Sequence, residues 1–179
     1  EQTYGKRDVS HVKYKKVIGP EPDEDKHPSK PPRNKVGAKH ILLVDAYNLI
    51  HANTELKELA RLDLGAAREK LSETVAEYAA MKGFEAIIVF DAYKNKDKLA
   101  SKEETLGVSL IFTASNETAD SYIERYVFEH IKNENITVVT SDRLEQMTIF
   151  QMGANRQSAS DFFKEFDMLK AQLMPRLLH

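Results

Sequence analysis

Four short, mostly apolar runs of residues constrain the fold of this chain more than any other feature of the sequence. They are ILLV (41–44), AIIVF (86–90), VSLIF (108–112) and ITVV (136–139), and polar residues bound each of them. Strands without alternation of apolar and polar residues are typical of parallel sheets that helices cover on both faces. Because helical patterns alternate with these runs, the sequence predicts a three-layer α/β/α fold around a central, mainly parallel sheet.

Helices account for most of the chain between the runs. Apolar residues recur at spacings of three and four from Leu64 to Ala79, and Gly83 follows, as glycine often does at the C-terminal end of a helix. By the same reasoning, helices are predicted over 47–60, 64–82, 117–132, 142–152 and 159–173, and a short edge strand over 154–158. With the four runs, these segments form one predicted domain over residues 40–179.

The N-terminal segment, residues 1–39, differs in composition from the rest of the chain. Five of the six prolines lie between positions 20 and 32, among charged residues. Such a segment buries too little apolar surface to offset its ordering entropy. We therefore predict an extended tail that binds a partner, with packing along its own domain as the alternative.

The charge of the chain is divided unevenly. Residues 1–40 contain ten Lys/Arg and six Asp/Glu, whereas residues 41–179 contain 16 Lys/Arg and 22 Asp/Glu. The predicted domain is therefore too acidic to bind nucleic acid by its overall charge. Binding of RNA would require neutralisation of some acids by a metal ion, or help from the basic tail.

The sequence excludes several classes of protein. No apolar run approaches the roughly 18 residues that a membrane-spanning helix needs, so a membrane is not an expected partner. The chain has no cysteine, which excludes disulfide frameworks, zinc ribbons and cysteine nucleophiles. The motifs GxxxxGK[ST], GxGxxG and GxSxG are absent too, which argues against P-loop nucleotidases, Rossmann dehydrogenases and serine hydrolases.

Aspartates stand where the predicted strands end. Asp45, Asp91 and Asp142 follow the runs ILLV, AIIVF and ITVV, and Asp120 lies in the first turn of the helix after VSLIF. Open parallel sheets bind ligands outside the carboxyl ends of their strands, near the switch in strand order, so these carboxylates are expected to converge. A single aspartate after a strand more often caps a helix or a turn, but the repetition favours a shared site.

Converging carboxylates raise one another's pKa, and a divalent cation removes that conflict. Oxygen ligands without sulfur or imidazole suit Mg²⁺ or Mn²⁺. Such an ion orients or activates a water molecule and neutralises charge on a phosphodiester. A haloacid-dehalogenase-type phosphatase fits less well, because it needs a second aspartate where this chain has Tyr47.

The segments VDAYNLI, VFDA, NETAD and TSDRLEQ, in this order and spacing, resemble the YacP-type branch of the NYN family. The branch belongs to the PIN-like nucleases and includes bacterial ribosome-associated endoribonucleases that cut mRNA in the ribosomal A site. The resemblance covers about residues 40–175, and Ala46 replaces the glycine of the usual DGYN motif. It implies a PIN-like fold, dependence on Mg²⁺ or Mn²⁺, and RNA cleavage, with the metal held by Asp45, Asp91, Asp120 and Asp142.

The resemblance also implies a partner, and the proline-rich tail, which is not part of the family's usual pattern, bears on the compartment. The ribosome, or another large assembly that handles RNA, is the expected partner of residues 1–39. The expected compartment is the cytoplasm for a bacterial protein, or the plastid stroma for an organellar homologue whose transit peptide has been removed.

Further residues near the predicted strand ends have candidate roles. Glu117 is a possible metal ligand, or an acid that stabilises the first turn of a helix. Asn48 and Ser141 are predicted to hold a water molecule or a phosphate oxygen, with helix capping as the alternative for Ser141. Glu124 lies one turn after Asp120 and is expected to support the ligands or to pair with a base.

Other side chains are candidates for contact with RNA, although a solvated loop is an equal alternative for the lysines. The candidates are Tyr47 and Tyr93 for stacking on bases, and Lys94, Lys96, Lys98, Arg143 and Arg156 for phosphates. The leading hypothesis is therefore a metal-dependent endoribonuclease. The alternatives are a catalytically weak subunit that binds RNA or serves as a scaffold, and a phosphatase of small phosphate esters.

Overall fold

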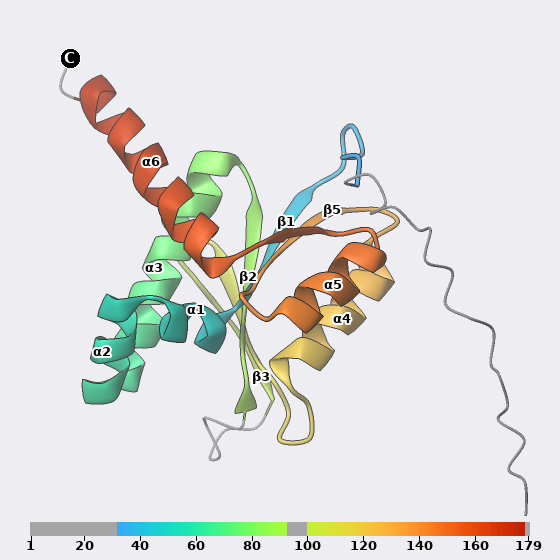
Figure 1. The fold of residues 1–179 in the computed structure, drawn as a ribbon, viewed down its shortest axis with the longest axis horizontal. Helices are drawn as coiled ribbons and strands as arrows, with labels where there is room; N and C mark the ends of the chain where they lie inside the picture. The colour runs from blue at the N-terminus through green and yellow to red at the C-terminus, as the bar shows by residue number, and fades with distance from the viewer. Residues whose placement is uncertain (1–31, 93–99, 178–179) are drawn as a thin grey trace, which may run out of the picture.

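A single mixed sheet forms the centre of the protein (Figure 1). The computed structural model describes residues 32–92 and 100–177, and within them six strands pair in the order β3-β4-β2-β1-β5-β6. The strands are β1 (His40–Asp45), β2 (Glu85–Phe90), β3 (Ser101–Thr105), β4 (Val108–Phe112), β5 (Asn135–Val139) and β6 (Asn155–Gln157). All neighbours are parallel except β3 and β4, which are antiparallel. The predicted parallel sheet is confirmed.

Helices cover both faces of the sheet (Figure 1). They are α1 (Ala46–Ala52), α2 (Thr54–Leu62), α3 (Leu64–Lys82), α4 (Ala119–His130), α5 (Arg143–Gln151) and α6 (Ala159–Leu177). Successive residues of β1 point to opposite faces: Leu42 and Val44 join the core under α1, α2, α3 and α6, whereas Ile41 and Leu43 join the core under α4 and α5. Burial on both faces explains the continuous apolar runs, and the three-layer prediction is confirmed. None of the helices in the described part of the chain is long and apolar enough to cross a membrane.

Two elements differ from the sequence-based prediction. The helix expected over 47–60 is broken at Asn53, whose side chain accepts a hydrogen bond from the Leu56 N–H at 2.9 Å and so begins α2 as its cap. Strand β3 was not predicted, because SKEET is an exposed, charged edge strand without an apolar pattern. Leu106 and Gly107 join it to β4 in a two-residue turn with positive φ at both positions (52° and 79°).

The folded unit begins before residue 40. The backbone N–H of Lys35 donates to the Asn135 side chain at 2.6 Å, and the Asn135 amide donates back to the Lys35 carbonyl at 2.9 Å. The Asn155 amide donates to the Asn34 side chain at 3.3 Å. The last residues of the predicted tail therefore pack on β5 and β6, and residues 1–31 lie outside the described part.

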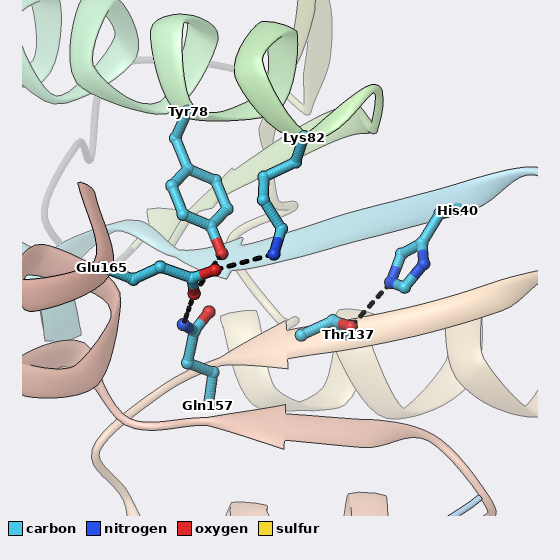
Figure 2. A network of polar contacts seen from close by, with 6 residues as sticks. All are labelled: His40, Tyr78, Lys82, Thr137, Gln157 and Glu165. Atoms are coloured by element: carbon cyan, nitrogen blue, oxygen red, sulfur yellow. Dashed lines mark hydrogen bonds and ion pairs between the residues drawn. The ribbon is translucent and has the colours of Figure 1, made fainter. Parts of the chain in front are cut away.

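A polar network fastens α6 to the rest of the protein (Figure 2). The Glu165 carboxylate accepts hydrogen bonds from the Tyr78 hydroxyl (2.8 Å), the Lys82 ammonium (2.7 Å) and the Gln157 amide (2.7 Å). Burial alone would raise the pKa of Glu165, but these donors outweigh it and lower the pKa. Helix α6 is thereby fixed to α3 and to β6, next to the strand that leads into Asp142.

Candidate functional site

The candidate site lies where the chain changes direction across the sheet. Strands β1 and β5 are neighbours, but the chain leaves β1 into helices on one face and leaves β5 into α5 on the other. This arrangement is a topological switch point, at which open α/β sheets bind ligands. Asp45 ends β1 there, and its side chain caps α1 by accepting a hydrogen bond from the Asn48 N–H at 3.4 Å.

Three carboxylates converge at this point. Asp45, Asp120 and Glu145 each offer one carboxylate oxygen, and these atoms lie within 4.8 Å of one another. Asp120 is in the first turn of α4, and Glu145 is in the first turn of α5. Glu145 is only 3% exposed, and both of its carboxylate oxygens are buried without a hydrogen-bond partner among the described residues.

The protein environment opposes full ionisation of this group. Burial, with the charges of Asp120 and Asp91 acting in the same direction, raises the pKa of Asp45 to about 7. Burial also raises the pKa of Glu145 to about 9, and the neighbouring charges of Asp45 and Asp120 act in the same direction. A divalent cation would supply the missing partner for the Glu145 oxygens, and the all-oxygen donor set fits a hard ion such as Mg²⁺ or Mn²⁺.

Sequence reasoning missed Glu145, because it also fits a common capping pattern. An N-cap aspartate followed three residues later by glutamate forms a capping box, in which the glutamate returns a hydrogen bond to the cap. Asp142 does cap α5, accepting from the N–H groups of Leu144 (2.9 Å) and Glu145 (3.2 Å). However, the Asp142 N–H donates to the Thr140 hydroxyl at 3.2 Å, and Glu145 turns inward instead. The available signal was its spacing of four from the buried Ile149, which puts a carboxylate on the apolar face of α5.

The four aspartates predicted from the sequence line one open cavity of about 520 Å³. Asp91 follows β2 and accepts a hydrogen bond from the Ala119 N–H, at the start of α4, at 3.2 Å. Asp142 is exposed at the start of α5. The structure therefore brings Asp45 and Asp120 into the three-carboxylate group with Glu145, and places Asp91 and Asp142 at the wall of the same cavity.

Asn48 and Ser141 hold the surrounding loops together. The Asn48 side chain accepts a hydrogen bond from the Ser141 N–H at 2.6 Å, which ties α1 to the connection between β5 and α5. The Ser141 hydroxyl in turn accepts from the Ala159 N–H, at the start of α6, at 3.1 Å. These bonds fix the positions of Asp45 and Asp142 relative to one another. Glu124 is half-buried one turn after Asp120 on α4.

Two of the predicted roles do not fit the structure. Glu117 pairs with the Arg125 guanidinium at 2.8 Å and is not part of the three-carboxylate group. Tyr47 is only 7% exposed, because α1 begins at Ala46 and turns the ring into the core against Phe90. A ring buried to this extent does not offer a face on which a base could stack.

The remaining candidates for RNA contact are less well defined by the structure. Arg143 is exposed in the first turn of α5, directly after Asp142. Arg156 is exposed on β6, with its guanidinium 4.8 Å from the centre of the Phe150 ring. Tyr93, Lys94, Lys96 and Lys98 lie outside the described residues.

Comparison with known proteins places this geometry in a family. The sequence model of the YacP-like NYN domain matches residues 42–177. The chain belongs to the YacP-like NYN family. It is 40% identical over 139 residues to the protein YacP of Bacillus subtilis (strain 168), which covers 76% of this chain and 81% of that protein. Membership in this family points to a nuclease that cleaves RNA, and to dependence on metal.

Solved structures agree with this assignment. The fold matches the crystal structure of Rae1 (YacP) from Bacillus subtilis with a TM-score of 0.64 and 37% identity, over 76% of this chain and 79% of that one. A mutant of Rae1 (YacP) matches with a TM-score of 0.65 and 38% identity, over 76% and 80% of the two chains. The predicted family and the predicted PIN-like fold are therefore both confirmed.

Proposed function

We propose that this protein is an endoribonuclease that requires Mg²⁺ or Mn²⁺, held by Asp45, Asp120 and Glu145. The observation that carries the proposal is Glu145, a carboxylate buried beside two others with no partner of its own among the described residues. Without a cation the raised pKa of about 9 keeps this carboxyl protonated at neutral pH, whereas ionised Glu145 needs a cation, because a buried charge without a partner is strongly unfavourable. The family supplies the substrate class, which is RNA.

The other residues of the cavity have distinct roles in this proposal. When bound, the ion supplies positive charge for the phosphodiester and lowers the pKa of a water molecule. Asp91 and Asp142, at the wall of the cavity, accept protons or position water near the reacting phosphate. Asn48 keeps the two sides of the cavity at a fixed distance through its bond to Ser141.

We extend the proposal to mRNA on the ribosome, with residues 1–39 as the segment that docks on the assembly. Support comes from the excess of basic over acidic residues in this segment, because ribosomal RNA is a polyanion. The cytoplasm is the proposed compartment, since the matched relative is bacterial; the plastid alternative stays a prediction.

The scaffold and phosphatase alternatives make different predictions. Ala46, which replaces the glycine of the usual DGYN motif, begins α1 with a helical backbone that alanine adopts without strain, so the replacement does not favour the scaffold. A scaffold has no need of a metal ion, and a phosphatase would hydrolyse a chromogenic phosphate monoester.

The test is cleavage of a labelled RNA by the wild-type protein in Mn²⁺, Mg²⁺ or EDTA, with Asp45→Asn in parallel. We expect cleavage that needs metal and falls by at least about 100-fold in the variant. Naked RNA is tested first, and translating ribosomes next. Absence of cleavage on both substrates would favour the scaffold, and cleavage that persists in EDTA would refute the metal-dependent mechanism.

A further inference from the structure

The Arg68 guanidinium is the clearest unused charge near the candidate site. We propose that Arg68 binds a phosphate of the RNA backbone next to the phosphate that is cleaved. The inference rests on the proposed function, and it assigns a role in RNA binding to a residue of α3. Arg68 is half-buried in the second turn of that helix.

The surroundings of Arg68 hold its guanidinium in one orientation. Its Nε and Nη2 atoms donate to the Tyr47 hydroxyl at 3.0 and 2.6 Å. The guanidinium carbon lies 5.7 Å from the centre of the Tyr47 ring and 5.8 Å from that of Phe90. A guanidinium has five N–H donors, so three remain for an anion, in the planar arrangement that suits phosphate.

Within the described part of the chain, Arg68 lacks the carboxylate partner that Arg61 and Arg125 have. Arg61 pairs with Glu58 at 2.9 Å, and Arg125 pairs with Glu117 at 2.8 Å. Among residues 32–92 and 100–177, no carboxylate oxygen lies within the 4.0 Å ion-pair distance of Arg68. The positive charge of this half-buried guanidinium is therefore not neutralised by a carboxylate of these residues, and it is available to bind an anionic ligand.

The location of Arg68 fits an RNA strand that passes over the carboxyl ends of the sheet. Tyr47, which holds Arg68, lines the same cavity as Asp45, and Phe90 directly precedes Asp91. The described residues that line this cavity include no lysine or arginine. An RNA strand that brings more negative charge to these aspartates therefore needs cations beside the metal ion. Arg143 follows Asp142 directly, and Arg68, which is not a lining residue but is bonded to the lining residue Tyr47, is the further cation that we propose.

The proposal is tested by RNA binding in an Asp45→Asn background, so that cleavage does not interfere. The full chain carries Arg68→Ala, Arg68→Lys or, as the matched control, Arg61→Ala, which removes one positive charge from an exposed pair on α2. Dissociation constants for a labelled single-stranded RNA are measured from about 0.05 to 0.3 M salt, the range over which phosphate contacts show their salt dependence.

We expect Arg68→Ala to weaken binding about 5- to 10-fold and to reduce the slope of log Kd against log salt by about 0.7, as for one lost phosphate contact in a single strand. Arg68→Lys should keep most of the slope, and Arg61→Ala should match the parent. A purely structural role would lower the melting temperature without changing the slope, so equal slopes for Arg68→Ala and Arg61→Ala overturn the proposal.

Tyr47→Phe keeps the experiment decisive if Arg68→Ala does not fold. This variant removes the hydroxyl that orients the guanidinium but keeps its charge. We expect weaker binding with an unchanged salt slope, and unchanged binding would overturn the proposal. If the wild-type protein cleaves RNA while the Arg68 variants bind normally, only this inference fails. If the wild-type protein does not cleave RNA and the Asp45→Asn parent does not bind it, the proposed function fails as well.

Discussion

Replacement of Glu145 by glutamine separates two effects of this carboxylate: the loss of protein stability caused by its burial, and its proposed role as a metal ligand. The substitution keeps the shape of the side chain and removes its charge. In the folded protein without metal, the pKa of Glu145 is about 9, against an ordinary value of 4.5. The folded state therefore binds more protons than the unfolded state between these values, and the stability of the metal-free protein falls as the pH rises from about 4.5 to about 9.

The magnitude follows from this difference in pKa. Each pH unit in the interval removes about 1.4 kcal/mol of stability, so the loss at pH 7 is about 3 kcal/mol and at pH 5 less than about 1 kcal/mol. Glutamine does not titrate and avoids the loss. For a chain of this length, Glu145→Gln should raise the melting temperature in EDTA by about 5–10 °C at pH 7 and by about 1–2 °C at pH 5.

Metal should offset most of this difference in stability at pH 7. Saturation with Mn²⁺ at 100 times Kd should stabilise the wild type by about 2.7 kcal/mol, and Glu145→Gln should lose most of this gain. The assay is thermal unfolding with EDTA or Mn²⁺ at the two pH values, with Glu69→Gln, an exposed change on α3, as the control. The reasoning is refuted if Glu145→Gln keeps the Mn²⁺ effect, or if its stability in EDTA falls with pH as in the wild type.

Three further substitutions test neighbouring parts of the account. Asp142→Asn preserves the cap of α5, because asparagine caps helices as well as aspartate does. The melting temperature should stay within about 1 °C of the wild-type value while RNA cleavage falls about 10-fold or more. Cleavage equal to that of the wild type would show that Asp142 is not part of the site. Asn48→Ala leaves the Ser141 N–H without its acceptor and should lower stability by about 1 kcal/mol and slow cleavage, which urea unfolding and initial rates measure. Tyr78→Phe removes one donor from Glu165 and should lower the melting temperature by about 2–4 °C at neutral pH. Because hydrogen bonds lower the pKa of Glu165, its contribution is present above about pH 4.5 and is lost as the pH falls through the lowered value, so the effect of Tyr78→Phe should shrink in acid.

The sequence predicted those parts of the fold in which one structural requirement acts on several residues at once. Burial on both faces makes a strand continuously apolar, so β1, β2, β4 and β5 were predictable. The rule for the carboxyl ends of parallel strands placed Asp45, Asp91, Asp120 and Asp142 at one edge, and they line one cavity. Strand β3 is a charged and mostly exposed strand at the edge of the sheet, so its sequence has no such apolar pattern.

Single side chains that have two reasonable positions were harder to predict. Glu145 fits a capping box as well as an inward carboxylate, and the choice depends on how α5 packs against Asp45 and Asp120. Tyr47 follows a predicted ligand, but the start of α1 at Ala46 decides that its ring points into the core. Arg68 is an ordinary helical arginine in the sequence, and only its contact with Tyr47 sets it apart.

The central claim is that Asp45, Asp120 and Glu145 hold the divalent ion that RNA cleavage needs. The most direct test is X-ray diffraction from crystals soaked in Mn²⁺, measured for the anomalous signal of manganese. The account predicts a peak within about 2.5 Å of carboxylate oxygens from all three residues or, if water mediates one contact, from at least two of them including Glu145. A peak on Asp91 or Asp142 alone, or none at a Mn²⁺ concentration that supports cleavage, would contradict it.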